Sequence, residues 1–209
     1  MKIVSLISSG IDSPVATYLL RKKVDEIIIL HGKIEPFTDK NEYENFLKLV
    51  KFFKKIIDKR VKIIVISHGK SLGEYIKNCD KKYTCIFCKR MLVRYAEKIC
   101  KKYNYDAIVM GDSLGQVASQ TLQNIKIVSE AVEVPILRPL IGFDKQDIVD
   151  ISRKIGTFEY STLQSIGCTA VPNKPSTAAK IEKIKTEENK INIEKLIEDA
   201  VKNSEIVKI

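Results

Sequence analysis

Short apolar runs alternate along the chain with segments in which apolar residues recur at helical spacing. We expect the runs to be strands, at residues 2–7, 25–31, 61–67, 106–110 and 134–137. We expect the amphipathic segments to be helices, at residues 14–20, 41–59, 91–103, 144–155 and 193–201. Continuous apolar strands alternating with helices are typical of a parallel sheet covered on both faces. The pattern therefore predicts a doubly wound α/β fold with a mostly parallel sheet of about five strands.

The connecting segments indicate one domain. Gly156 follows the predicted helix that begins after Asp144, and both residue types suit helix ends. Residues 70–88 show no clear period, and no internal repeat or low-complexity linker divides the chain. We therefore expect a single catalytic-type domain over residues 1–209, with residues 172–209 as a charged extension. Ligands of such sheets bind beyond the carboxyl ends of the strands.

Composition places the chain among ordinary globular proteins. Its 209 residues are 44% hydrophobic and 30% charged, and no run of 18 apolar residues predicts a membrane span. The short apolar start leads directly into a motif, which disfavours a signal peptide and makes a cytoplasmic location the expectation. The net charge of +10 suits a polyanionic partner such as RNA, although a generally lysine-rich surface explains it equally well.

The first predicted strand ends in a small-residue loop that leads into a helix. The loop reads Ser8-Ser9-Gly10-Ile11-Asp12-Ser13. Small residues allow backbone N–H groups to approach a phosphate, and a helix N-terminus adds partial positive charge. The Gly-Lys-Ser/Thr ending of a Walker loop is absent. The loop resembles the S-G-G-x-D-S pyrophosphate loop of ATP pyrophosphatases that adenylate their substrates, with Ser9 in place of the first glycine.

Two further strings are more specific than this loop. One reads Met110-Gly-Asp-Ser-Leu-Gly-Gln-Val-Ala-Ser-Gln-Thr-Leu122, and the other reads Pro135-Ile-Leu-Arg-Pro-Leu-Ile-Gly-Phe-Asp-Lys145. With Cys168 they resemble the catalytic domain of the tRNA 4-thiouridine synthetases, also called tRNA sulfurtransferases, over essentially the whole chain. The resemblance implies an adenine nucleotide alpha-hydrolase-like fold of the HUP type. Because Met1 opens directly on this region, we expect the chain to lack the THUMP and rhodanese domains of family members.

The resemblance also implies roles for particular residues. It places ATP against the loop residues Ser8, Ser9, Gly10, Asp12 and Ser13 and against Leu6, Ile7, His31, Gly32, Gly111 and Gln120. Lys89 or Arg90 stands where the family has a basic contact to ATP. Asp12 is expected to act at the pyrophosphate through Mg²⁺ or by holding the loop, and Lys145 to neutralise the α-phosphate under attack. A fixed ammonium and a metal ion are the usual stabilisers of such developing charge.

The cysteines carry the remaining chemistry. Cys85 and Cys88 form a C-x-x-C motif, whose thiolates can bind a metal or form a redox pair. Cys168 matches the family's catalytic cysteine. In members without a rhodanese domain, these three cysteines bind an iron–sulfur cluster, so the resemblance implies a cluster (4Fe-4S) with one iron open for sulfide. A disulfide between Cys168 and either partner, or a zinc site, is the alternative.

These expectations amount to an enzyme that uses ATP to adenylate a uridine oxygen in tRNA and then replaces it with sulfur from sulfide or a persulfide. The alternatives are an enzyme that thiolates a small molecule or a sulfur carrier, and a subunit that only binds a nucleotide or a cluster. The RNA could be gripped by a separate partner protein. The family resemblance and the aromatic residues of the predicted helix 41–59 favour a homodimer, and nothing points to a membrane.

Overall fold

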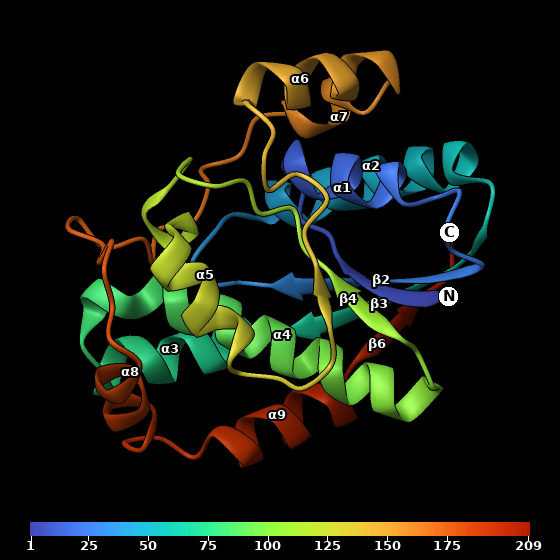
Figure 1. The fold of residues 1–209 in the computed structure, drawn as a ribbon. Helices are drawn as coiled ribbons and strands as arrows, with labels where there is room; N and C mark the ends of the chain where they lie inside the picture. Colours follow the sequence, from blue (N-terminus) through green and yellow to red (C-terminus); the bar gives the residue numbers. More distant parts are fainter.

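The computed structural model describes residues 1–209, and its centre is a six-stranded sheet between two layers of helices (Figure 1). The strand order is β5-β4-β1-β2-β3-β6. Their bounds are β1 Lys2–Leu6, β2 Glu26–Lys33, β3 Arg60–Ser67, β4 Ala107–Val109, β5 Ile136–Leu137 and β6 Glu205–Val207. All neighbouring strands are parallel except β6, which is antiparallel to β3. The predicted α/β class and the mostly parallel sheet are confirmed.

The helices cover both faces of this sheet. One layer contains α1 (Asp12–Leu19), α2 (Lys40–Ile57), α6 (Lys145–Lys154) and α7 (Phe158–Ser161), and the other contains α3 (Gly69–Asn78), α4 (Thr84–Tyr103), α5 (Leu122–Ser129), α8 (Ile181–Glu188) and α9 (Ile193–Lys202). Two short 3₁₀ turns, η1 (Lys81–Tyr83) and η2 (Ala118–Gln120), complete the chain. No helix has both the length and the apolar character that a membrane span requires.

Side chains of β1 alternate between the two cores, which explains why this strand reads as uniformly apolar. Ile3 packs in the core below α1 and α2, whereas Val4 packs in the core with α4, and both are fully buried. The same alternation holds for Ile27 and Ile28 in β2. Burial on both faces removes the polar half of the usual strand pattern.

Three expectations about local structure were wrong. The segment expected to be irregular, residues 70–88, contains α3, η1 and the first turns of α4. A sixth strand, β6, follows α9 and pairs with β3. Its three residues carry too little pattern to predict a strand, and the pairing arises because α9 delivers the chain to the open edge of β3. Residues 181–201 are also more than a charged tail, since Ile184 and Ile197 belong to the buried core with α4.

The aromatic residues of α2 face the interior of the protein. Phe46 and Phe53 are fully buried, and Phe52 stacks on Tyr160 of α7 at 4.8 Å between ring centroids. Phe46 and Phe53 are therefore part of the core, and Phe52 packs against α7, so these aromatic residues give no support to a subunit interface.

Candidate adenylation and sulfur-transfer site

The phosphate loop lies where the sequence predicts it, between the carboxyl end of β1 and the start of α1. The hydroxyl of Ser13 accepts a hydrogen bond from the Ser8 N–H at 3.0 Å, and the Ser8 hydroxyl accepts one from the Gly10 N–H at 3.3 Å. Ser161 of α7 donates to the Gly10 carbonyl at 3.3 Å, which ties the loop from outside. Small side chains thus fold the backbone into a turn at the head of a helix, a geometry that suits an anion.

This loop forms one wall of a cavity of about 320 Å³ at the carboxyl ends of β1, β2 and β4. The cavity lining includes most of the residues expected to bind ATP: Leu6, Ile7, Ser8, Gly10, Asp12, Ser13, His31, Gly32, Lys89, Gly111 and Gln120. Strand topology explains the convergence, because parallel neighbours end at the same edge of the sheet. Two expected residues, Ser9 and Arg90, are not part of this lining.

Arg90 corrects one sequence-based expectation. Its guanidinium is buried and donates to both carboxylate oxygens of Glu188, at 2.8 and 2.9 Å. Arg94 donates to the same carboxylate at 2.7 and 2.8 Å. Burial alone would raise the pKa of Glu188, but the two arginines lower it to about 2. Arg90 therefore joins α4 to α8, and Lys89 is the basic residue that α4 presents to the cavity.

Lys89 belongs to a charge cluster that the sequence analysis missed. Its ammonium donates to Asp112 at 2.6 Å, and Arg138 donates to the same carboxylate at 3.0 Å. Gln120 lies 3.5 Å from it. Burial raises the pKa of Asp112, but the two cations outweigh this and hold it below its ordinary value. Asp112 and Arg138 both stand within the recognised strings, yet the motif alone does not reveal that one carboxylate positions three side chains.

His31 and Glu42 form a second buried pair at the other wall. The Nδ1 atom of His31 is 3.0 Å from the Ile7 carbonyl, its Nε2 is 3.5 Å from Glu42, and its ring stacks on Phe46. Burial raises the pKa of Glu42. Interactions with His31 and Ser9 lower this pKa by more than burial raises it, so the net shift is downward.

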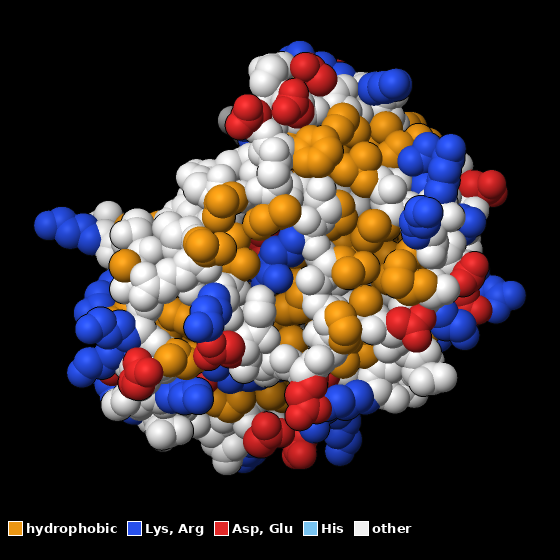
Figure 2. Space-filling view, viewed as in Figure 1, with side chains coloured by type: hydrophobic (Ala, Val, Ile, Leu, Met, Phe, Trp, Pro, Cys, Tyr) orange, Lys and Arg blue, Asp and Glu red, His pale blue; other side chains and the backbone are white.

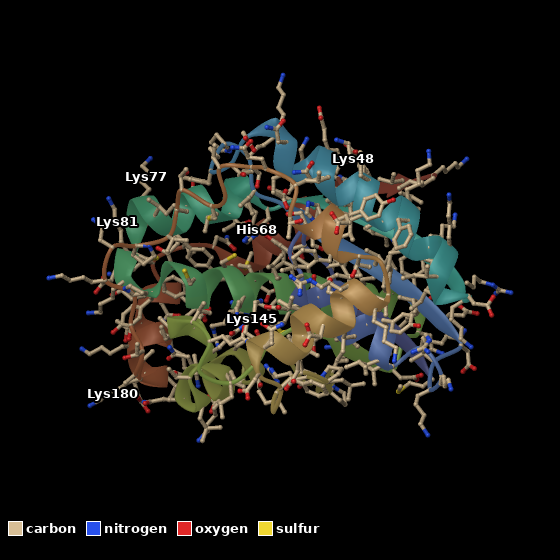
Figure 3. All side chains as sticks on the ribbon, turned by 90° about the horizontal axis from the view of Figure 1, so that it is seen from above. Lys48, His68, Lys77, Lys81, Lys145 and Lys180 are labelled. Atoms are coloured by element: carbon tan, nitrogen blue, oxygen red, sulfur yellow. The ribbon has the colours of Figure 1, made fainter.

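Lys145 is the first residue of α6 and reaches across to the phosphate loop. Its ammonium lies 2.5 Å from Asp12 Oδ1, and about half of its side chain is exposed. Figure 3 shows Lys145 near the middle of the view. The structure therefore brings the two residues expected to act on the phosphates into direct contact, although 133 positions separate them.

Gly111 makes the close approach between β4 and the phosphate loop possible. A Cβ atom at this position would lie 2.8 Å from the backbone N and Cα of Ser13. A Cβ at Gly32 would similarly lie 2.5 Å from Leu92 of α4. Both glycines therefore bring backbone directly to the cavity, where larger residues would displace its walls.

The charge of Cys168 acts on both Cys85 and Cys88, which indicates that the three expected cysteines lie near one another. Cys85 and Cys88 lie in the first turns of α4, and Cys168 is exposed in the loop after α7. Burial raises the pKa of both helix thiols, that of Cys88 to about 12, and the charge of nearby Cys168 adds to this effect while Lys89 opposes it. All five cysteines are free thiols, and no three His, Cys, Asp or Glu side chains are arranged to hold a metal ion. As placed, the cysteines do not fit the implied iron–sulfur cluster.

A buried hydrogen-bonded chain leads away from Cys88. Burial lowers the pKa of His68 to about 4, so its imidazole is neutral at pH 7. The Tyr95 hydroxyl donates to Ser71 at 2.7 Å, so it can accept a hydrogen bond from His68 Nδ1, which lies 3.4 Å away. The neutral imidazole then has no proton on Nε2, and this atom accepts a hydrogen bond from the Cys88 thiol at 3.3 Å. This chain was not predicted, because only the packing of α3 against α4 brings His68 and Ser71 to Cys88 and Tyr95.

The fold and the cavity together define the class. The chain is an α/β protein of the adenine nucleotide alpha-hydrolase type, with a small-residue loop after its first strand and a cavity at the carboxyl ends of β1, β2 and β4. A family model described as "Thiamine biosynthesis protein (ThiI)" matches residues 1–193. The chain belongs to this family, as the sequence strings indicated.

Similarity extends to individual relatives. A "Probable tRNA sulfurtransferase" of Methanobrevibacter smithii is 45% identical over 201 residues, which cover 95% of this chain and 52% of that protein. The chain spans about half the length of the curated relatives it matches. A solved 4-thiouridine synthetase, in a complex with RNA and bound ATP, superposes with a TM-score of 0.92 at 30% identity and covers 99% of this chain and 55% of that one. The NMN synthetase of Francisella tularensis, at 13% identity, TM-score 0.54 and coverage of 96% and 83%, shows the fold alone.

Proposed function

We propose that this chain is the catalytic domain of an ATP-dependent tRNA sulfurtransferase that adenylates a uridine and then installs sulfur. The observation that carries the proposal is the juxtaposition of two chemistries around one cavity. Phosphate-binding groups, including the Asp12–Lys145 pair, form one side. The cysteines lie beside the opposite side of the cavity. Cys88 contacts His68, and His68 in turn packs against Gly32 of the cavity lining. The ATP and RNA bound by the 4-thiouridine synthetase support the same substrates here.

In the first step, the uridine O4 attacks the α-phosphate of ATP and pyrophosphate leaves. The oxygen of a pyrimidine carbonyl is a poor leaving group, and the adenylate ester makes AMP the leaving group instead. Backbone N–H groups of the loop hold the departing phosphates, while Lys145 and Lys89 supply fixed positive charge. Mg²⁺ bound with the nucleotide would add charge neutralisation at Asp12, whose carboxylate lies at the cavity wall.

In the second step, a sulfur nucleophile attacks the uridine C4 and displaces AMP. Cys168 is the exposed thiol of the three cysteines and is proposed to carry this sulfur as a persulfide. Its thiolate takes the outer sulfur from a donor persulfide, and the donor's own thiol leaves. The terminal sulfur of the Cys168 persulfide bonds to C4. A thiolate from Cys85 or Cys88 then attacks the Cys168 Sγ, which releases the 4-thiouridine and leaves a protein disulfide. The exposure of Cys168 and the position of Cys85 and Cys88 in the first turns of α4 support this assignment.

The iron–sulfur cluster is a competing hypothesis for sulfur delivery. The arrangement of the cysteines does not support it, and no step above depends on it. Iron and sulfide are measured in protein purified without oxygen. About three to four iron atoms per chain with a matching amount of sulfide, both lost in Cys85→Ala, would establish the cluster. Iron-free protein that still forms 4-thiouridine from a persulfide donor would exclude it.

The proposed activity is tested with Lys145→Ala and the matched control Lys154→Ala, since both lysines are exposed on α6. Wild-type chain and control should release pyrophosphate from ATP when tRNA is present, and mass spectrometry should find 4-thiouridine. Lys145→Ala should lose adenylation at least about a hundredfold, the magnitude typical of a lost electrostatic stabiliser. Equal pyrophosphate release by the two variants would remove the assignment of Lys145. Product on a small molecule instead of tRNA would identify a different acceptor.

We also propose that the chain acts as a homodimer, on the basis of the family alone, because α2 buries the aromatic residues that suggested an interface. Light scattering at micromolar concentration tests this, and a mass corresponding to one chain would contradict it.

A further inference from the structure

Five exposed lysines lie along one edge of the protein without a carboxylate partner. They come from the end of α3, from η1, and from the segment that leads into α8 and its first turn. We call this set the basic edge, and it consists of Lys77, Lys81, Lys174, Lys180 and Lys183. Figure 3 shows Lys77, Lys81 and Lys180 together on one side of the molecule with their side chains directed outward. Figure 2 shows Lys and Arg side chains gathered at the corresponding margin, over α3 and α8.

Backbone contacts join these segments into one surface. The Ser176 N–H donates to the Lys82 carbonyl at 3.0 Å, which attaches the segment before α8 to η1. The carboxylate of Glu187, at the end of α8, accepts the Asp80 N–H at 2.9 Å. The relative positions of the lysines are therefore set by the fold, even though about 100 residues separate η1 from α8.

Most carboxylates of this region are already neutralised. Asp80 pairs with Lys82 at 2.8 Å, and Glu187 pairs with Lys190 at 2.6 Å. Glu188 is buried between two arginines. Glu182 of α8 and Glu74 of α3 have no cationic partner, so five free ammonium groups face two such carboxylates there. The edge consequently presents a net positive potential, which attracts a polyanion.

The basic edge leads directly to the proposed sulfur-transfer chemistry. Tyr83 ends η1, Thr84 begins α4, and Cys85 follows in the same turn. A polyanion bound along the edge would therefore reach the start of α4, where Cys85 lies and from which Lys89, one turn further on, lines the cavity. Distributed ammonium groups suit the regularly spaced phosphates of a nucleic acid better than a single small anion.

We propose that the basic edge binds the sugar–phosphate backbone of the RNA substrate and places the acceptor base at the nucleotide cavity. The proposal rests on the proposed function, which supplies RNA as the substrate. It adds that this domain itself contacts RNA, at a surface separate from the ATP-binding residues. These contacts are phosphate contacts, and they position the substrate without reading its sequence.

The test measures tRNA binding by the 209-residue chain with fluorescence anisotropy across a range of salt concentrations. The edge variant combines Lys77→Glu, Lys81→Glu and Lys180→Glu. The control variant makes the same change in charge with Lys23→Glu, Lys55→Glu and Lys59→Glu, which are exposed, unpaired and located at the amino ends of the strands or beside them. Melting temperature and ATP binding are measured for all three proteins.

The edge variant should raise the Kd for tRNA at least about tenfold and reduce the slope of log K against log salt by about 2, because three phosphate contacts are lost. The control should change the Kd by less than about threefold, and ATP binding should be equal in all three. Equal loss of RNA affinity in the two variants would overturn the proposal that the basic edge binds RNA, and it would leave the proposed function intact. A wild-type chain that binds ATP but no tRNA would overturn both the inference and the proposed acceptor.

Discussion

Asp112 offers the sharpest test of how the cavity is held together. Its side chain is 4% exposed, and its partners Lys89 and Arg138 are 19% and 11% exposed. Asp112→Asn keeps the size and one acceptor oxygen but removes the charge, which leaves two largely buried cations without compensation. Removing one partner of a buried ion pair typically costs about 3–5 kcal/mol. Because Asn retains part of the hydrogen bonding, we expect a loss of about 3 kcal/mol in the free energy of unfolding.

The dependence on pH gives this prediction a second, independent readout. The pKa of Asp112 is lower in the folded protein than in the unfolded chain, where it is about 3.9, because the two cations outweigh burial. The carboxylate therefore contributes stability that is fully present above the unfolded pKa and is lost as the pH falls through the folded pKa. The difference between wild type and Asp112→Asn should be constant from about pH 6 to 8 and should shrink below about pH 4.

Urea denaturation followed by circular dichroism measures both effects, and Asp150→Asn is the control. Asp150 pairs with Arg153 at 3.8 Å on the exposed face of α6, so its loss should cost less than about 0.5 kcal/mol. Affinity for ATP should also fall in Asp112→Asn, because Lys89 loses the partner that holds it at the cavity. A stability within about 1 kcal/mol of wild type, with an unchanged m-value, would refute the argument that this carboxylate organises the cavity.

Two further predictions concern the frame around the site. Glu188→Gln should destabilise the fold by about 3 kcal/mol at pH 7 and much less near pH 2, because the pKa of Glu188 in the folded protein is about 2. Glu182→Gln, an exposed position on the same helix, is the control in the denaturation series. Gly111→Ala should weaken ATP binding and cost about 1–3 kcal/mol, because the added methyl would overlap the first turn of α1. Gly142→Ala adds a methyl in open space, and calorimetry should find it close to wild type.

Local pattern was sufficient for most of the scaffold and for the phosphate loop. Strands such as β2 are recognisable because burial on both faces leaves a contiguous apolar run, and α6 because its ends carry Asp144 and Gly156. The loop at Ser8–Ser13 is also contiguous, so its residue types can be read directly from the chain. The pattern failed for β6, whose pairing depends on an open sheet edge that only the folded chain provides.

The sequence could not predict which of the side chains of Lys89 and Arg90 points into the cavity. Neighbouring positions on a helix point about 100° apart, so one of two adjacent basic residues reaches the cavity and the other is buried. The choice depends on Glu188, about 100 positions further along the chain, which provides the carboxylate that Arg90 needs in the core.

Residue types and family membership are properties of the linear chain, and they were enough to predict the class of fold and the small-residue turn between β1 and α1. The charge cluster at Asp112, the pairing of Asp12 with Lys145 and the basic edge were decided only by tertiary structure. The physical reason is that burial and electrostatic interaction depend on distance in space. Contacts between segments far apart in the chain leave no periodic signal in the sequence, because only the packing of helices on both faces of the sheet brings them together.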